Sequence, residues 1–234
     1  MQRHHRYYDL ILAAFVVVLL CSNFIGAGKT ATLDLPLLGP VIFGAGILFF
    51  PIAYFFGDIM TEVYGYAYDR RAVWAGFTAL AFAAIMAQIV IALPVAPGTY
   101  MAQYQEGLET VFGNSWRIAL ASMLAFWCGS FSNSYVLAKM KIMTHGRHLW
   151  TRTIGSTVVG ELVDSSLFYM IAFYGIWSTP EIIQVALAQY VLKTVWEVLA
   201  TPITYAVVRY LKHKENEDFY DTNTNFTPFR VKVE

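Results

Sequence analysis

The sequence predicts an all-α, polytopic membrane protein, folded as a bundle of six transmembrane helices. Three observations lead to this fold class: charge is scarce, long apolar segments recur, and basic residues gather between alternate segments. Hydrophobic residues make up 57% of the 234-residue chain, and charged residues make up 14%, against about 25% in soluble domains. The net charge of zero disfavours a nucleic-acid binder, and two cysteines, Cys21 and Cys128, are too few for a disulfide scaffold.

Six segments are long and apolar enough to cross a bilayer, which takes about 20 residues of helix. They cover residues 8–26, 41–64, 72–94, 117–139, 154–177 and 182–210. Glycine, proline and polar residues separate neighbouring segments, as Ala96-Pro97-Gly98 does after the third. We therefore expect one membrane domain over residues 1–211, followed by a polar, loosely ordered cytosolic tail over residues 212–234.

Basic residues favour one side of the membrane. If the six segments cross in turn, thirteen of the 16 Lys and Arg residues fall on the side that holds both termini. Lys29 and Arg117 fall on the other side, and Lys193 lies within the last segment. Because cytoplasmic loops carry an excess of Lys and Arg, both termini are predicted to lie in the cytosol. The thirteen are Arg3, Arg6, Arg70, Arg71, Lys139, Lys141, Arg147, Arg152, Arg209, Lys212, Lys214, Arg230 and Lys232.

Six ionisable residues fall within the apolar segments, where a charge at the helix centre costs at least about 2.5–3.5 kcal/mol. They form three sets at helical spacing: Asp58 with Glu62, Glu161 with Asp164, and Lys193 with Glu197, the last extended by Gln189 one turn earlier. Residues three or four apart share one face of a helix. Because charged faces are not viable in contact with lipid, we expect all three to point into the bundle.

Three of these carboxylates are predicted at the same depth. Asp58, Asp164 and Glu197 each lie twelve residues along the chain from an Arg at the cytosolic end of their segment. At about 1.5 Å per residue this separation is about 18 Å, close to the half-thickness of about 15 Å of the hydrocarbon core. The three side chains should therefore meet near the midplane.

Two interpretations of this polar set remain open. An internal network of ion pairs, with Lys193 and Glu197 as one pair, would fix the packing of the helices. Five acids against a single Lys would instead leave most carboxylates unpaired, which favours a site for a substrate or a proton. Glu62 and Glu197 are the candidates to carry a proton.

Other side chains complete a candidate substrate-binding site with these residues. Asn133 lies in the cytosolic half of the fourth segment. Phe56, Tyr169 and Trp196 lie near the carboxylates in the sequence and could stack on a planar ligand, although lipid contact is the simpler interpretation. Carboxylates beside aromatic rings suit a cation or a flat heterocycle rich in N–H donors. Catalytic constellations and metal-ligand motifs are lacking in the sequence, and we expect no cofactor.

Several blocks of the sequence resemble the queuosine precursor transporter family of bacterial inner-membrane proteins, also called the vitamin uptake transporter family. They are CSNFIGAGKT (21–30), FPIAYFFGDIMTEVYGY (50–66), GSFSNSYVLAKMK (129–141), RTIGSTVVGELVDSSLFY (152–169) and YVLKTVWEVLATPITY (190–205). The blocks GDIMTEVYGY and GELVDS are the most specific. The resemblance runs from the first predicted segment to the end of the sixth.

The resemblance implies a six-span importer of 7-cyano-7-deazaguanine, and of its aminomethyl form, in the bacterial inner membrane. Its partners would be the heterocyclic substrate and the lipid bilayer, without nucleic acid, and the packing glycines are compatible with a homodimer. Asp58, Glu161 or Asp164 would accept the adjacent N–H donors of the base. Two alternatives stay open: a substrate-capture subunit that needs an ATPase module, and an intramembrane enzyme that uses paired carboxylates as acid and base.

Overall fold

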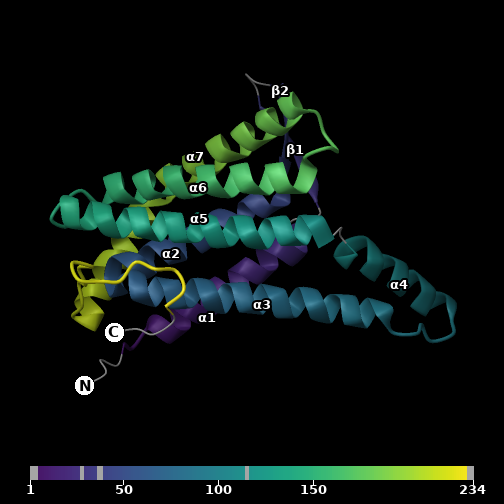
Figure 1. Ribbon diagram of the computed structural model, residues 1–234, viewed down its shortest axis with the longest axis horizontal. Helices are drawn as coiled ribbons and strands as arrows, with labels where there is room; N and C mark the ends of the chain where they lie inside the picture. Colours follow the sequence, from purple (N-terminus) through teal and green to yellow (C-terminus); the bar gives the residue numbers. More distant parts are fainter. Residues whose placement is uncertain (1–4, 27–28, 36–38, 114–115, 231–234) are drawn as a thin grey trace.

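The computed structural model describes residues 5–26, 29–35, 39–113 and 116–230, and this part of the chain is mainly helical (Figure 1). Its α-helices are α1 (Tyr8–Cys21), α2 (Phe50–Tyr64), α3 (Tyr66–Ala92), α4 (Thr99–Phe112), α5 (Trp116–Met143), α6 (Leu149–Phe173) and α7 (Thr179–Glu215). The shorter elements are the π-helical turn η1 (Ser22–Gly26), strands β1 (Thr30–Leu35) and β2 (Gly39–Gly44), and the 3-10 turn η2 (Ala45–Leu48).

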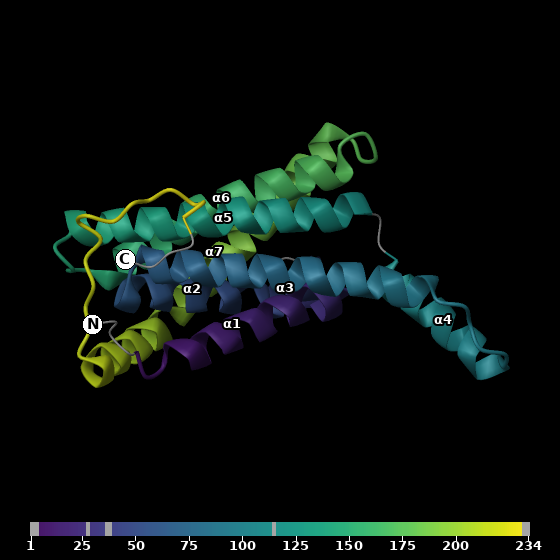
Figure 2. The same ribbon diagram turned by 60° about the horizontal axis from the view of Figure 1, so that its bottom comes forward.

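The long helices lie side by side in one bundle (Figures 1 and 2). α5 packs closely against α6, and α2 contacts α1, α3, α5 and α7. The backbone N–H of Tyr7 donates to Glu215 Oε1 at 2.7 Å, which ties the start of α1 to the end of α7. We call this end of the bundle the termini end, and the opposite end the far end.

Among the described residues, five helical segments are long and apolar enough to cross a membrane. They are Tyr8–Gly26, Ala45–Tyr64, Tyr66–Ala92, Leu149–Phe173 and Thr179–Glu215. The predicted segment 117–139 lies within α5, which is not among the five although its 28 residues span about 42 Å. Large apolar side chains on the outer surface, such as Phe82 and Ile85 of α3 and Leu199 of α7, are exposed. Apolar surface of this kind is typical of a helical membrane protein.

The second predicted segment, 41–64, is not one continuous helix. Its first residues form β2, which pairs antiparallel with β1 from Thr30 opposite Gly44 onwards. The turn η2 then leads into α2, where Pro51 occupies the first helical turn, a position that needs no backbone N–H partner. The helical part of this segment is therefore shorter than predicted, and a small hairpin precedes it.

Two predicted loops contain helix instead. Residues 68–71, expected between the second and third segments, lie within α3, because the chain reverses earlier, at Gly65. Gly65 has φ +92°, a conformation that glycine adopts without steric cost. The loop after the third segment contains α4, whose partly buried Met101, Leu108 and Phe112 follow at helical spacing. The polar residues between them hide this weak apolar stripe in the sequence.

Residues 216–230, which we call the C-terminal strap, run back along the bundle at the termini end (Figure 2). The two carboxylate oxygens of Asp221 accept the backbone N–H of Tyr66 at 3.1 and 3.2 Å. Arg70 Nη1 donates to the carbonyl oxygen of Asn225 at 2.6 Å. The expectation of a loosely ordered tail is therefore wrong for these residues. Lys232, like Arg3, lies outside the described residues.

Aromatic contacts also hold the C-terminal strap in place. The ring of Phe226 lies 5.0 Å from that of Tyr66, and Lys139 Nζ lies 4.0 Å from the Phe226 ring centre. Trp74 Nε1 donates to the carbonyl oxygen of Pro228 at 2.7 Å. Because these partners belong to α3 and α5, the strap joins helices that are distant in sequence.

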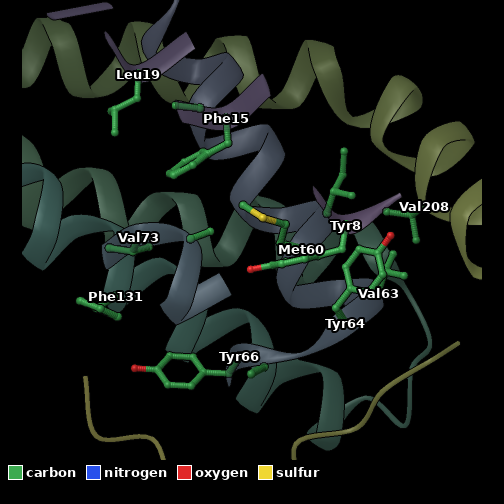
Figure 3. Close-up of a cluster of buried hydrophobic side chains, with 14 of the residues drawn as sticks. Tyr8, Phe15, Leu19, Met60, Val63, Tyr64, Tyr66, Val73, Phe131 and Val208 are labelled. Carbon is green, nitrogen blue, oxygen red and sulfur yellow. The ribbon is translucent and has the colours of Figure 1, made fainter. Parts of the chain in front are cut away.

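The apolar core lies mainly between α1, α2 and α3, with contributions from α5 and α7 (Figure 3). Phe15 and Leu19 of α1 pack against α3 at Gly76, where an added Cβ would lie 2.7 Å from Leu19 Cδ2. Met60 and Val63 are buried in this core and lie on one face of α2. The opposite face of α2 is polar, so packing of the apolar face directs the polar face toward α5, α6 and α7.

The contact between Gly65 and the strap leads to a prediction. A Cβ at position 65 would overlap the ring of Phe219 and would stand on a left-handed backbone. We expect Gly65→Ala to lower the free energy of unfolding by about 1–3 kcal/mol, measured by denaturation of the purified protein in detergent. Gly107→Ala in α4 is the matched control, because an added Cβ meets nothing within 4 Å there. Equal stability of the two variants would contradict the described strap.

Candidate functional site

The six ionisable residues predicted within the apolar segments are all buried, with exposed fractions from 0% to 9%. Their helix faces therefore point into the bundle, as their spacing predicts. Their contacts divide them into three groups. In the first group, Glu62 is surrounded by basic side chains. The second is the trio Glu161, Asp164 and Lys193, and the third is the pair Asp58 and Glu197.

Glu62 lies toward the termini end and is neutralised by cations from three other helices. Arg152 Nε donates to its Oε2 at 2.7 Å, and Arg152 Nη2 donates to its Oε1 at 2.8 Å. Lys212 Nζ lies 2.5 Å from Oε1, and Lys141 Nζ lies 3.6 Å from it. Bidentate, charge-assisted hydrogen bonds are strong, so Glu62 is the centre of a structural ion cluster.

The ion cluster also includes the C-terminal strap. Asp218 Oδ1 lies 2.6 Å from Lys141 Nζ and 2.8 Å from Lys212 Nζ. Partial burial opposes ionisation of Asp218, but the hydrogen bonds from the two lysines outweigh it and lower its pKa below the usual value. Lys141 Nζ also donates to the carbonyl oxygen of Phe219 at 2.7 Å. Four helices and the strap therefore meet at one set of charges.

Lys193 of α7 pairs with α6 rather than with its own helix. Its Nζ lies 2.7 Å from Glu161 Oε2 and 2.7 Å from Asp164 Oδ2. The ion pair between Lys193 and Glu197, which one of the two open interpretations included, is therefore replaced by pairs with Glu161 and Asp164. The physical reason is that α6 presents two carboxylates, one turn apart, directly opposite the ammonium group. Three of the five acids are thus ion-paired, and the expectation that most would be unpaired is wrong.

Asp58 and Glu197 are the acids of this set that no basic side chain contacts in the described part of the chain. Asn133 Nδ2 donates to Asp58 Oδ1 at 2.6 Å, while Asp58 Oδ2 and Asn133 Oδ1 have no hydrogen-bond partner there. Both carboxylate oxygens of Glu197 likewise have none. Asp58 and Glu197 interact electrostatically across α2 and α7, and their exposed fractions are 0% and 1%. Buried acceptors without donors are costly, so this group is suited to a ligand that supplies donors.

Four residues with buried hydroxyl groups lie on the helices that carry these polar residues, and the sequence analysis did not select them. They are Tyr54, Thr61, Thr157 and Ser165, and none of their hydroxyl groups has a hydrogen-bond partner within the described residues. Tyr54 interacts electrostatically with Asp58, Glu161 and Asp164, so it lies between the pair and the trio. Their sequence positions could have identified two of them, because Tyr54 and Thr61 lie four residues before and three residues after Asp58 and therefore share its helix face.

Two glycines set the distance between the helices at this level. A Cβ on Gly160 of α6 would lie 2.8 Å from Asn133 Cβ and 3.0 Å from the carbonyl oxygen of Gly129. A Cβ on Gly129 of α5 would lie 2.6 Å from the hydroxyl oxygen of Tyr54. The backbones of α5 and α6 therefore cross here without side chains between them, as is common for helix pairs in membranes.

The remaining predicted site residues are placed differently. Phe56 packs against the apolar core, because two residues along a helix correspond to about 200° around its axis from Asp58. Tyr169 stacks on Phe173, with ring centres 5.9 Å apart, and interacts electrostatically with the Lys193 trio. Gln189 and Trp196 are partly buried on α7. The structure thus brings Tyr169 toward the polar residues and leaves Phe56 on the opposite face of α2.

The fold and the site together define a class of protein. Among the described residues, no group of three or more His, Cys, Asp or Glu side chains could hold a metal ion. A bundle of membrane-length helices around buried polar groups, several of them without partners, is the usual arrangement in small-molecule transporters.

Comparisons with known proteins identify the family. Residues 44–207 match the family model described as "Putative vitamin uptake transporter", and the chain belongs to this family. The chain is 32% identical over 189 residues to the "Probable queuosine precursor transporter" of Bacillus subtilis (strain 168). The aligned residues cover 80% of this chain and 76% of that protein. It is 23% identical over 186 residues to the "Queuosine precursor transporter" of Escherichia coli (strain K12), covering 76% and 78%.

No solved structure shows a significant match to the chain. The family is one of transporters and not of enzymes. The alternative of an intramembrane enzyme with paired catalytic carboxylates is therefore excluded.

The ion cluster leads to a second prediction. We expect Arg152→Gln to lower the free energy of unfolding by about 3 kcal/mol, because Glu62 stays buried and loses its bidentate partner. The double variant Glu62→Gln/Arg152→Gln should lose less stability than the sum of its single variants. Arg71→Gln, at an exposed position of the same end, is the control. If denaturation in detergent shows that the double variant loses the sum of the stability lost by the two single variants, the described pair of Glu62 and Arg152 is contradicted.

Proposed function

We propose that this protein imports queuosine precursors, 7-cyano-7-deazaguanine and its aminomethyl form, across a bacterial inner membrane. Membership of the transporter family and the names of the two relatives support this substrate class. The observation that carries the proposal is a set of buried acceptor oxygens, Asp58 Oδ2, Asn133 Oδ1 and both carboxylate oxygens of Glu197, that no donor of the described residues reaches. An acceptor-rich site between helices suits a flat heterocycle that is rich in N–H donors.

Recognition of the base would begin at Asp58 and Asn133. A 7-deazaguanine offers a ring N–H and an exocyclic amino group side by side, which are donors. Asp58 Oδ2 and Asn133 Oδ1 accept no hydrogen bond from the described part of the chain, and their two residues are already hydrogen-bonded to each other at 2.6 Å. That hydrogen bond orients both groups before the ligand arrives, which lowers the cost of binding. Because an ionised carboxylate accepts stronger hydrogen bonds than a neutral group does, a charged Asp58 would strengthen the contact with the base.

Neighbouring side chains would complete the site. The hydroxyl of Tyr54 lies beside the acceptors and could bond the carbonyl oxygen or a ring nitrogen of the base. Tyr169 and Trp196 are the candidate stacking rings, and Gln189 extends the polar face of α7. Glu161, Asp164 and Lys193 would form the wall of the site beyond Tyr54. Glu62 and Phe56, which were in the predicted set, have structural contacts instead and are left out of the proposal.

The proposed topology has six transmembrane helices with both termini in the cytosol. α5 supports the sixth crossing, because about 42 Å of helix exceeds a hydrocarbon thickness of about 30 Å. The basic side chains Lys141, Arg152 and Lys212 lie together at the termini end, which supports a cytosolic location for that end.

A third prediction concerns uptake. We expect Asp58→Asn and Asp164→Asn, made separately, each to abolish uptake of labelled 7-cyano-7-deazaguanine by cells that cannot synthesise it. Asp58→Asn removes a charged acceptor and places an amide N–H donor against the donors of the base. Loss of one charge-assisted hydrogen bond costs about 1.5–3 kcal/mol, which corresponds to at least a tenfold loss of uptake. Asp164→Asn leaves Lys193 with Glu161 alone.

Glu106→Gln, an exposed carboxylate of α4, is the matched control and should transport normally. Membrane abundance of every variant is measured by immunoblot. Normal uptake by both aspartate variants would mean that these carboxylates are structural. Uptake by liposomes that contain the purified chain alone would exclude the alternative of a capture subunit, whereas uptake that appears only with an ATPase module would support it.

A further inference from the structure

The charges inside the bundle are not neutralised equally. Glu62 has Arg152 and Lys212 within 2.8 Å of its carboxylate, and Lys193 bridges Glu161 and Asp164. Asp58 and Glu197 receive no basic side chain in the described part of the chain, although they are as deeply buried as Glu62. Lys193, one helical turn before Glu197 on α7, is engaged with Glu161 and Asp164.

The groups that neighbouring elements add around this pair are neutral or acidic, apart from Lys193 of α7, which is engaged by Glu161 and Asp164. Tyr54 of α2 interacts electrostatically with Asp58. Asn133 of α5 donates a hydrogen bond to Asp58. Asp69 of α3 and Glu62 of α2 interact with Asp58 electrostatically, and Asp69 is itself hydrogen-bonded by Ser134. Glu161 of α6 interacts electrostatically with Glu197, and its charge is offset by Lys193. α1 contributes apolar side chains such as Phe15 and Leu19 to the apolar core.

Two carboxylates that interact in a buried site cannot both carry a charge without a large desolvation and repulsion cost. One proton shared between them removes that repulsion and leaves a single negative charge. Glu62 does not need a proton, because its ion cluster supplies the neutralising charge. The contacts therefore distinguish between the two proton carriers, Glu62 and Glu197, that the sequence left open.

We propose that Asp58 and Glu197 form a proton-binding site, and that one proton enters the cell with each substrate molecule. This proposal rests on the proposed function. Asp58 faces Asn133 and would be the carboxylate that accepts the N–H donors of the substrate. Glu197, whose two oxygens have no hydrogen-bond partner among the described residues, would hold the proton while the substrate is bound. Proton and substrate then leave to the cytosol while the site is open to water, which solvates both carboxylates. The empty pair takes up a new proton when the site opens to the outside.

The test uses the purified full chain in liposomes that contain a pH-sensitive dye. External 7-cyano-7-deazaguanine should acidify the lumen as it enters. An inward proton gradient should raise steady-state accumulation by up to about tenfold per pH unit, since one pH unit is a tenfold factor for one proton. Glu197→Gln should exchange labelled for unlabelled substrate more slowly than the native protein, and it should neither acidify the lumen nor respond to the gradient. Glu197→Asp, which keeps a carboxyl group, should restore acidification, and Glu106→Gln should behave as the native protein.

The outcomes separate the two proposals. Uptake by the native protein without acidification and without a response to the gradient would overturn the proton site and leave the proposed function intact. Lack of uptake in every condition would contradict the proposed function, and the proton site with it. Acidification by Glu197→Gln equal to that of the native protein would overturn the assignment of the proton to this pair. Loss of both exchange and acidification in Glu197→Asp, in protein that melts like the native chain, would do the same.

Discussion

A carboxylate inside a helix bundle must be neutralised from within the bundle, and the other polar contacts of this protein follow from that constraint. The cost of an unneutralised charge in a membrane protein amounts to several kcal/mol. Glu62 meets the constraint with Arg152 and two lysines, and Glu161 and Asp164 meet it with Lys193. Within the residues that the structure describes, no basic side chain pairs with Asp58 or Glu197, which is why the proposed substrate and proton are assigned to them.

The same constraint explains how the bundle is held together. Because Glu62 needs several cations, it draws α5, α6 and α7 toward α2 at the termini end, and Asp218 brings the C-terminal strap to the same charges. One level deeper, Gly129 and Gly160 allow α5 and α6 to approach closely. A movement of α6 or α7 during transport would therefore have to rearrange either the ion cluster, which lies between the proposed site and the termini end, or the Lys193 trio.

The sequence predicts the parts of the fold that depend on one helix at a time. Spacing alone indicates that Asp58, Glu161 and Glu197 point inward, because the faces of a helix are fixed by its geometry. It cannot decide which partners meet across helices, and so it offered Glu197 of the same helix as a partner for Lys193, which pairs instead with Glu161 and Asp164 of α6. Lys141 and Arg152 were counted as loop residues, yet both are buried in helices, since a count of charges does not show what each one contacts.

Other features were missed because their signals depend on tertiary contacts. The strap has the composition of a solvated tail, and only the surfaces of α3 and α5 give residues such as Asp221 and Phe226 their partners. The unpartnered hydroxyls of Tyr54 and Thr61 resemble ordinary membrane residues until their neighbours are known. Conversely, Phe56 was selected by closeness in sequence to Asp58, although helix geometry directs it to the apolar core.

The most direct test of the central claim is an experimental structure of the protein with 7-cyano-7-deazaguanine bound. The account predicts the base between α2, α5 and α7, with its N–H donors about 3 Å from Asp58 Oδ2 and Asn133 Oδ1 and with the Glu62 ion cluster intact. A base bound elsewhere would contradict it, for example in the apolar groove lined by Phe55, Phe56 and Tyr210. A bound base that leaves both Asp58 and Glu197 without contacts would contradict it equally.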